Sequence, residues 1–374
     1  MIGGQVVAER LVLFSLRRAL KTGWPQAGEM PTFPRMNRKP NLTIRGADQI
    51  TNRTLFHWRS RGHRLGWVGG LMLGALILAG CTASRPPVAE GEDFTAPPPV
   101  TAKAWAITDG RTGELLWGLN ADEPRKAAST TKMMCAYVIL ELAARQPDVL
   151  DEVVTFSPLA DNTGGSTAGI KAGERVPVRE CLYGLLLPSG NDAGNALAEH
   201  FNDRFAPPDA RLNALGLGHP AFATRANFIA EMNRTAGRLG MTNTIYRSAF
   251  GDGGTPDDRT ITARDLTRLA WRAMQNPLFR HYVATERHEC QVRTPEGGTR
   301  PAAWTNTNHL LTLHAGYDGI KTGTTTQAGA CLVSSGRRGN DHLLVAVLGS
   351  ESGNGRFVDT RNLYRWAWQR RGHR

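Results

Sequence analysis

Residues 126–142 read KAASTTKMMCAYVILEL, in which Ser129 and Lys132 form the pattern S-x-x-K at the start of an apolar helix. One helical turn separates positions i and i+3, so we expect the two side chains to lie within reach of each other. A serine hydroxyl is a weak nucleophile that needs a base, and a lysine is a base only when its amine is uncharged. Burial and a neighbouring cation both favour the uncharged amine. The stretch therefore predicts a serine nucleophile with a lysine base.

Two further short strings follow in order along the chain. Residues 189–191 read SGN, after a predicted helix that Pro188 breaks, and residues 321–323 read KTG on a predicted strand. We expect Gly323 to let a substrate backbone approach the strand, whose edge could pair with an extended peptide. Each string alone recurs by chance, whereas the three in this order and context predict one catalytic site.

The pattern of strands and helices around these strings predicts the fold class. Strands are expected at 104–108, 114–119, 317–323, 330–335 and 343–348, and helices at 129–145, 178–187, 192–201, 228–239, 262–274 and 358–369. Thr262, with Asp265 three residues later, is expected to cap its helix. Residues 203–224 are rich in Pro, Ala, Gly and Leu and are expected to form a loop insertion. The order predicts an α/β (α+β) fold, with a sheet made from both ends of the chain and a helical region at about 150–300.

The composition excludes wholesale disorder and weakens the case for a nucleic-acid-binding protein. The chain has 374 residues, of which 41% are hydrophobic, enough for a substantial core. It carries 45 Lys and Arg against 33 Asp and Glu, but residues 1–80 alone hold 12 basic and 3 acidic residues. The rest of the chain is nearly balanced, so the basicity does not indicate a nucleic-acid partner.

An apolar run of 14 residues, 65–78, is short for a membrane span, which takes about 20 residues. Arginines precede it, and Leu78-Ala79-Gly80-Cys81 resembles a bacterial lipobox, so we expect Cys81 to be lipidated. An ordinary cleaved signal or an uncleaved anchor is the alternative. The expected organisation is an unstructured or wrongly assigned leader at 1–58, with Met36 as another possible start, then a lipoprotein signal at 59–80, a Pro-rich tether at 81–101 and a catalytic domain at 102–374. The domain is expected to face the periplasm or the exterior from a membrane of the cell envelope.

The remaining cysteines and the histidines give no metal-site pattern. Cys135, Cys181, Cys290 and Cys331 could pair in an exported protein, but apolar neighbours around three of them favour buried free thiols. There is no CxxC pair, no HExxH and no histidine grouping with zinc-ligand spacing. We therefore expect neither a metal nor a cofactor.

The sequence around the three strings closely resembles the D-alanyl-D-alanine carboxypeptidase family of low-molecular-mass serine penicillin-binding proteins. The resemblance covers about residues 102–370 and is carried by LLLPSGNDAGNALAE (185–199), MNRTAGRLGMTNT (232–244), TNTNHLL (305–311) and GYDGIKTGTTTQAGACL (316–332), together with the first stretch. It implies a β-lactamase/DD-peptidase-like fold: an antiparallel sheet flanked by helices, an all-helical subdomain, and an active site between them. It also implies removal of the terminal D-Ala from peptidoglycan stem peptides and inhibition by β-lactams.

The resemblance assigns a role to each matching residue. Ser129 would be the acylated nucleophile, Lys132 the general base, Ser189 a proton relay to the leaving group, and Asn191 a holder of the substrate peptide. Lys321 would set the local field and orient Ser189.

The other matching residues would bind the substrate. The family's substrate-facing strand corresponds to Thr322, Gly323 and Thr324, and the backbone N–H groups of Ser129 and Thr324 resemble its oxyanion hole. Arg356, which Phe357 follows, would bind the terminal carboxylate.

Several alternatives remain open. A DD-endopeptidase would cleave peptidoglycan cross-links with the same residues. A β-lactamase needs a carboxylate to activate water, and Asp209-Ala210-Arg211-Leu212-Asn213 resembles its ExxLN loop only superficially, with Asp for Glu and only 20 residues after Ser189. A catalytically silent peptidoglycan-binding lipoprotein is disfavoured by the intact Ser129, Lys132 and Lys321.

Overall fold

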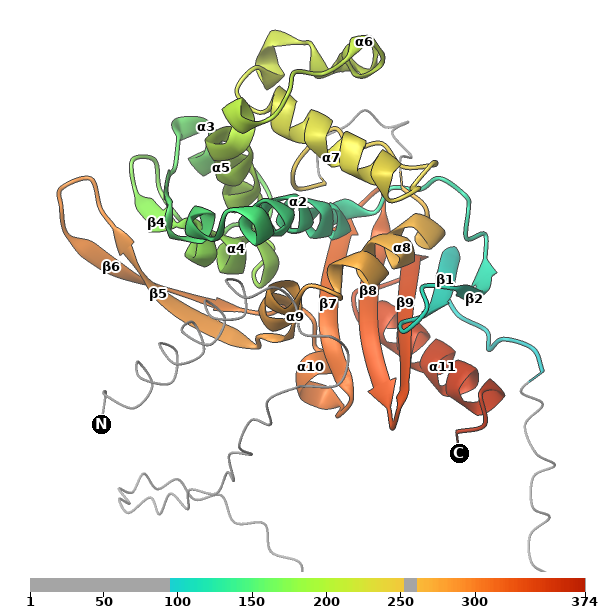
Figure 1. The fold of residues 1–374 in the computed structure, drawn as a ribbon. Coiled ribbons are helices and arrows are strands. Elements are labelled where there is room, and N and C mark those ends of the chain that lie inside the picture. The colour runs from blue at the N-terminus through green and yellow to red at the C-terminus, as the bar shows by residue number, and fades with distance from the viewer. Residues whose placement is uncertain (1–94, 252–260, 374) are drawn as a thin grey trace, which may run out of the picture. The chain divides into compact units, whose positions relative to one another are not determined.

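The main sheet combines strands from the beginning and the end of the described residues, as the element order predicted. The computed structural model describes residues 95–251 and 261–373 (Figure 1). In it a five-stranded antiparallel sheet has the order β2-β1-β9-β8-β7. Its strands are β1 (Ala104–Asp109), β2 (Leu115–Leu119), β7 (Tyr317–Thr325), β8 (Gly329–Arg338) and β9 (Asp341–Ser350). The strand that carries the K-T-G string, β7, therefore lies at one edge of this sheet.

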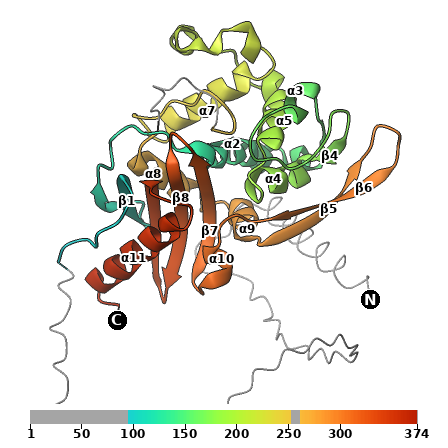
Figure 2. The ribbon, with the colours of Figure 1, turned by 180° about the vertical axis from the view of Figure 1, so that it is seen from behind.

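Helices cover both faces of the sheet because its central strand is apolar on both. In β9, Leu343, Val345 and Val347 belong to the core beneath α11 (Gly355–Arg370). The alternating residues Leu344 and Ala346 belong to the core on the other face, where α8 (Ala263–Ala273) packs. Figure 2 shows α11 on the face turned away from the viewer of Figure 1.

The last helix packs on the sheet, as the spacing of its apolar residues predicted. Leu363, Trp366 and Ala367 are buried, and the Trp366 ring meets Trp105 and Trp117 edge to face. The segment before β1 is attached to the same helix. Thr101 donates from its N–H and its hydroxyl to the carboxylate of Asp359 (2.9 and 2.7 Å).

The helical region surrounds one central helix, α2 (Lys132–Arg145), which is buried along nearly its whole length. Around it lie α4 (Val178–Leu186), α5 (Asn191–Phe201), α7 (Ala226–Arg238) and α9 (Pro277–Ala284), with α8 beside them (Figure 1). The predicted cap of α8 is confirmed: the Thr262 hydroxyl accepts a hydrogen bond from the Asp265 N–H.

A second antiparallel sheet within this region was not predicted, so the region is not all-helical. Its order is β3-β4-β5-β6, with β3 (Val153–Thr155), β4 (Arg175–Pro177), β5 (Arg287–Arg293) and β6 (Thr299–Thr305). Two of these strands have only three residues, and β5 reads RHECQVR with most of its side chains at least partly exposed. Neither feature gives the apolar alternation from which strands are predicted.

The segment 203–224 was predicted to be a loop, but the structure folds much of it into short helices. α6 (Ala210–Leu212) is capped by Asp209, whose carboxylate accepts the Leu212 N–H. Arg234 of α7 donates to the Ala206 carbonyl at 2.9 Å. The other short helical elements of the described chain are η1 (Ala128–Thr131), η2 (Pro147–Asp151), α3 (Pro158–Asp161), η3 (Asn202–Arg204), η4 (Asn213–Leu217), η5 (Pro220–Phe222) and α10 (Leu310–Leu313).

The predicted leader, apolar run and Cys81 lie outside the described residues. Within 95–251 and 261–373, no helix combines the length and the apolar composition needed to cross a membrane. The same residues contain no group of three His, Cys, Asp or Glu side chains placed to hold a metal ion. The four cysteines after Cys81 are free thiols, three of them buried, as their apolar neighbours predicted.

Candidate active site

Ser129 lies in a tight turn that is pressed against the edge strand. The turn is the 3-10 segment η1, entered through Ala128 in a left-handed conformation (φ +48°), which costs a non-glycine residue energy. A Cβ atom on Gly323 of β7 would stand 2.8 Å from the Ala127 carbonyl oxygen and 3.0 Å from the Ser129 nitrogen. The missing side chain of Gly323 thus makes room for the turn that carries Ser129, a close approach that was not predicted.

Lys132 is fully buried next to Ser129. Its Nζ donates to Ser129 Oγ at 2.8 Å, to Asn191 Oδ1 at 2.6 Å and to the Phe250 carbonyl at 2.9 Å. The contact between Ser129 and Lys132 is the one that the spacing of three residues predicted.

A second buried lysine lies close to the first. Lys321 is 1% exposed, and burial, followed by repulsion from Lys132 and Arg356, holds its pKa well below the ordinary value for lysine. Its Nζ donates to the Thr322 carbonyl at 3.1 Å. Two buried ammonium groups side by side would be costly, so this arrangement favours an uncharged amine in the site.

Ser189 is held in a strained backbone conformation, and its hydroxyl is not bonded to either lysine. Its φ is +69°, and its buried Oγ makes no hydrogen bond within the described part of the chain. The expected orientation of Ser189 by Lys321 is therefore not visible as a direct contact. A buried, unpaired hydroxyl with strained backbone is typical of a functional position.

The side-chain amide of Asn191 makes hydrogen bonds within the protein, whereas the resemblance implied that it holds the substrate peptide. It is fully buried, its Oδ1 contacts Lys132, and its Nδ2 donates to the Gly164 carbonyl at 2.7 Å. Its backbone N–H donates to the Ser166 carbonyl, also at 2.7 Å. Asn191 thus links the lysine to the loop 163–169.

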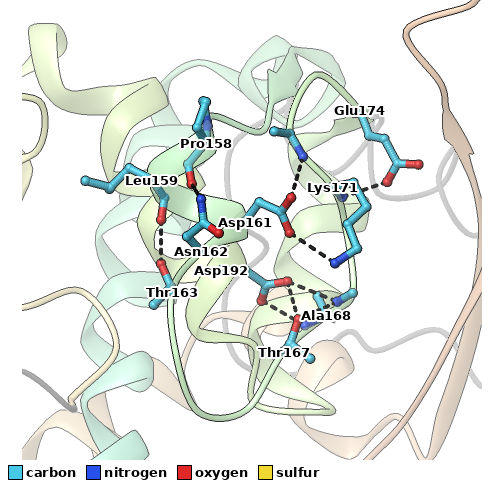
Figure 3. A network of polar contacts seen from close by, with 12 residues as sticks. Pro158, Leu159, Asp161, Asn162, Thr163, Thr167, Ala168, Lys171, Glu174 and Asp192 are labelled. Carbon is cyan, nitrogen blue, oxygen red and sulfur yellow. Dashed lines mark hydrogen bonds and ion pairs between the residues drawn. The ribbon is translucent and has the colours of Figure 1, made fainter.

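The loop 163–169 is fixed mainly by Asp192, a residue that the sequence analysis did not single out. Its carboxylate accepts hydrogen bonds from Thr167 Oγ1 (2.7 Å), the Ala168 N–H (2.8 Å) and the Gly169 N–H (3.0 Å). Figure 3 shows Asp192 pointing into the loop, with Asp161 holding the adjacent turn through Lys171. The only sequence signal for this role is an acidic residue in the first turn of α5, directly after the S-x-N string.

The end of β7 brings together the remaining predicted residues. Thr322 Oγ1 lies 2.6 Å from Thr307 Oγ1, a contact that was not predicted although residues 305–311 carry part of the resemblance. Arg356, at the start of α11, donates from Nη1 to the Gly323 carbonyl (3.1 Å) and to Thr324 Oγ1 (2.7 Å). Burial lowers the pKa of its guanidinium from the ordinary value. The structure therefore places a cation beside the exposed edge residue Thr324.

Comparison with known proteins identifies relatives over most of the described chain. The model of a family described as peptidase S11, D-alanyl-D-alanine carboxypeptidase, matches residues 92–204 and 214–352. The D-alanyl-D-alanine carboxypeptidase of Streptomyces sp. (strain K15) is 35% identical over 300 residues, 79% of this chain and 95% of that protein. DacC of Escherichia coli (strain K12), a D-alanyl-D-alanine carboxypeptidase, is 30% identical over 74% of this chain, which spans 64% of its length.

The structural comparison agrees with these matches. The crystal structure of the Streptomyces K15 DD-transpeptidase is 33% identical, with a TM-score of 0.63 over 73% of this chain and 99% of that one. The gap in the family match, 205–213, falls inside the predicted insertion and contains the string Asp209–Asn213. Because Asp209 caps a short helix there, that string gives no support to the β-lactamase alternative.

Proposed function

The chain belongs to the D-alanyl-D-alanine carboxypeptidase family, and on this premise we propose that it removes the terminal D-Ala from peptidoglycan stem peptides through an acyl-enzyme on Ser129. The observation that carries the proposal is the 2.8 Å contact between Ser129 Oγ and the buried Lys132 Nζ. The lowered pKa of the neighbouring Lys321 supports it, because burial and the mutual repulsion of the two lysines also disfavour a charged Lys132, and only an uncharged lysine can act as a base.

In the proposed acylation, one proton moves from Ser129 to Lys132 and then to the leaving nitrogen. Uncharged Lys132 takes the hydroxyl proton of Ser129 while Oγ bonds to the carbonyl carbon of the penultimate residue. The backbone N–H groups of Ser129 and Thr324 would stabilise the oxyanion. The bond to the terminal D-Ala nitrogen then breaks, and the proton that Lys132 accepted passes to that nitrogen through the Ser189 hydroxyl, which is unpaired in the structure. Water finally cleaves the Ser129 ester, so one water is consumed for each D-Ala released.

The proposed substrate lies along the edge of β7. An extended peptide can add to an open strand edge through main-chain hydrogen bonds, and β7 is the terminal strand of its sheet. Such a peptide would run past Thr324, with its free carboxylate near Arg356. β-Lactams would bind as inhibitors in the same place, since they also present a carboxylate and a reactive carbonyl.

Product analysis tests the reaction. The protein is incubated with a stem pentapeptide ending in D-Ala-D-Ala, with a cross-linked dimer, and with the pentapeptide plus an amine acceptor. We expect free D-Ala and tetrapeptide in equal amounts from the pentapeptide. Cleavage of the dimer alone would instead identify an endopeptidase, and a transfer product in place of free tetrapeptide would identify a transpeptidase, the activity for which the Streptomyces K15 structure is named. Rapid turnover of penicillin would indicate a β-lactamase.

We further propose that a lipid on Cys81 anchors this domain to a membrane of the cell envelope, because the apolar run and the string Leu78–Cys81 fit a lipoprotein signal. Replacing Cys81 by alanine is expected to release the protein from the membrane fraction and to abolish labelling with a fatty-acid analogue. Cys290→Ala, at a partly exposed free thiol, is the matched control and should keep both. Unchanged membrane association of Cys81→Ala would place the anchor elsewhere.

A further inference from the structure

The Phe250 carbonyl is a backbone group that contacts the proposed base. It accepts a hydrogen bond from Lys132 Nζ at 2.9 Å, beside the 2.6 Å bond from the same atom to Asn191 Oδ1. Both oxygens are carbonyl oxygens and can only accept. An uncharged amine that donates its two hydrogens to them directs its remaining lone pair toward the third neighbour, Ser129 Oγ. The Phe250 carbonyl and Asn191 Oδ1 together would therefore orient the lone pair of an uncharged Lys132.

The segment 241–251, which ends just after this carbonyl, is attached to α7 by the side chain of Asn233. Asn233 accepts the Tyr246 N–H with Oδ1 and donates to the Tyr246 carbonyl with Nδ2, both at 2.8 Å. Nδ2 also donates to the Ile229 carbonyl at 2.9 Å, so the amide is fixed to its own helix. This pairing holds Tyr246 at both backbone groups, four residues before Phe250.

The same segment has two further attachments. Asp265 of α8 accepts the Asn243 N–H (3.2 Å) and the Thr244 hydroxyl (2.8 Å). At the other end, Ser248 Oγ accepts the Gly251 N–H at 2.8 Å and closes the turn that contains Phe250.

The segment is packed tightly against the turn of the nucleophile. Gly251 has φ +99°, and a Cβ atom there would stand 2.0 Å from the Ala128 carbonyl oxygen. The Phe250 carbonyl thus has little freedom in the direction of Ser129, whereas its distance from Lys132 depends on the attachments described above.

We propose that Asn233 is a positioning residue for acylation: by fixing Tyr246, with Ser248 closing the following turn, it places the Phe250 carbonyl so that the uncharged Lys132 presents its lone pair to Ser129. The inference rests on the proposed function, because it assumes that Lys132 accepts the Ser129 proton. It adds a residue remote from the substrate that acts through a backbone carbonyl.

The test measures acylation of the full chain by a fluorescent penicillin and separates the non-covalent dissociation constant from the acylation rate constant. We expect Asn233→Ala and Ser248→Ala each to lower the acylation rate constant about 10- to 100-fold, the range for a small misplacement of a reacting group. The dissociation constant should change less than about threefold, since the substrate contacts are untouched, and the final stoichiometry should remain one adduct per chain. Asn227→Ala, on the same helix, is the matched control, since its side chain makes no hydrogen bond among the described residues, where only its backbone N–H contacts Asn202.

Each outcome decides between named explanations. If Asn233→Ala forms fewer adducts per chain but the remaining active protein reacts at the normal rate, Asn233 only supports the fold. Ser248→Ala, which removes one oxygen from a turn, then tests the inference: a lowered acylation rate constant supports it and a normal one overturns it. Normal acylation rates in both folded variants, or an equal loss in Asn227→Ala, would overturn the inference while leaving the proposed function standing. A wild-type protein that forms no adduct would overturn the proposed function itself.

Discussion

Replacing Ser129 by alanine is expected to abolish the covalent penicillin adduct and to lower D-Ala release by about 10³- to 10⁶-fold, the range for loss of a serine nucleophile. The physical reason is that Ser129 Oγ is the hydroxyl that lies against the Lys132 amine, at 2.8 Å, so its removal takes away the group from which the base would accept a proton. Mass spectrometry of the penicillin-treated protein, followed by peptide mapping, measures both the presence and the position of the adduct.

The matched control is the second serine of the site. Ser189→Ala is expected to slow acylation but to leave the adduct on Ser129, because its hydroxyl is proposed to relay a proton and not to attack. An adduct that persists in Ser129→Ala, or that maps to Ser189 in the wild-type protein, would show that the roles have been assigned wrongly.

Local spacing allowed the centre of the site to be predicted. Ser129 and Lys132 are three residues apart in one helical segment, so their contact depends on local geometry alone. The main sheet could be predicted for a similar reason. Its strands, above all β9 with DHLLVAVLGS, are long and apolar enough to be distinguished from the helices that follow and precede them.

What the sequence did not reveal depends on contacts between distant segments. The Phe250 carbonyl contacts Lys132 across 118 residues, and a backbone oxygen has no signature in the identity of its residue. Gly323 was predicted to admit a substrate backbone, whereas the close approach in the structure is that of the turn of Ser129, which spacing along the chain does not indicate. The amide of Asn191 is likewise occupied by Lys132 and Gly164, which only the folded chain brings to it.

The small second sheet was missed for a different reason. Strands β3 and β4 are three residues long, and β4 meets β5 through a single residue pair, Arg175 and Arg293. Such strands are stabilised by what packs around them, here including the Trp304 Nε1–H, which donates to the Ala168 carbonyl at 2.8 Å. Their own residues carry too little periodicity to predict them.

Replacing Arg356 by alanine is expected to lower kcat/KM for a peptide ending in D-Ala-D-Ala by roughly 30- to 1000-fold, about 2–4 kcal/mol of transition-state binding. A free carboxylate next to the scissile bond loses its hydration on binding, which is costly unless a fixed cation replaces the water. Arg356 is anchored for this role, since its Nη1 donates to Gly323 and Thr324 at the end of β7. Both of these contacts use Nη1, and Nη2 makes no hydrogen bond in the described chain, so the guanidinium retains donor capacity.

Two substrates distinguish recognition of the carboxylate from support of the fold. A small activated thioester without the carboxylate should be hydrolysed by Arg356→Ala at close to the wild-type rate, because acylation of Ser129 does not itself require the guanidinium. Arg361→Ala, an exposed arginine on the same helix, is the matched control and should leave both substrates unaffected. An equal loss on both substrates would mean that Arg356 acts by holding Gly323 and Thr324 in place, and no loss on the peptide would make it a surface charge. Only a loss confined to the peptide fits an arginine that binds the terminal carboxylate of the substrate, because the thioester has no such carboxylate.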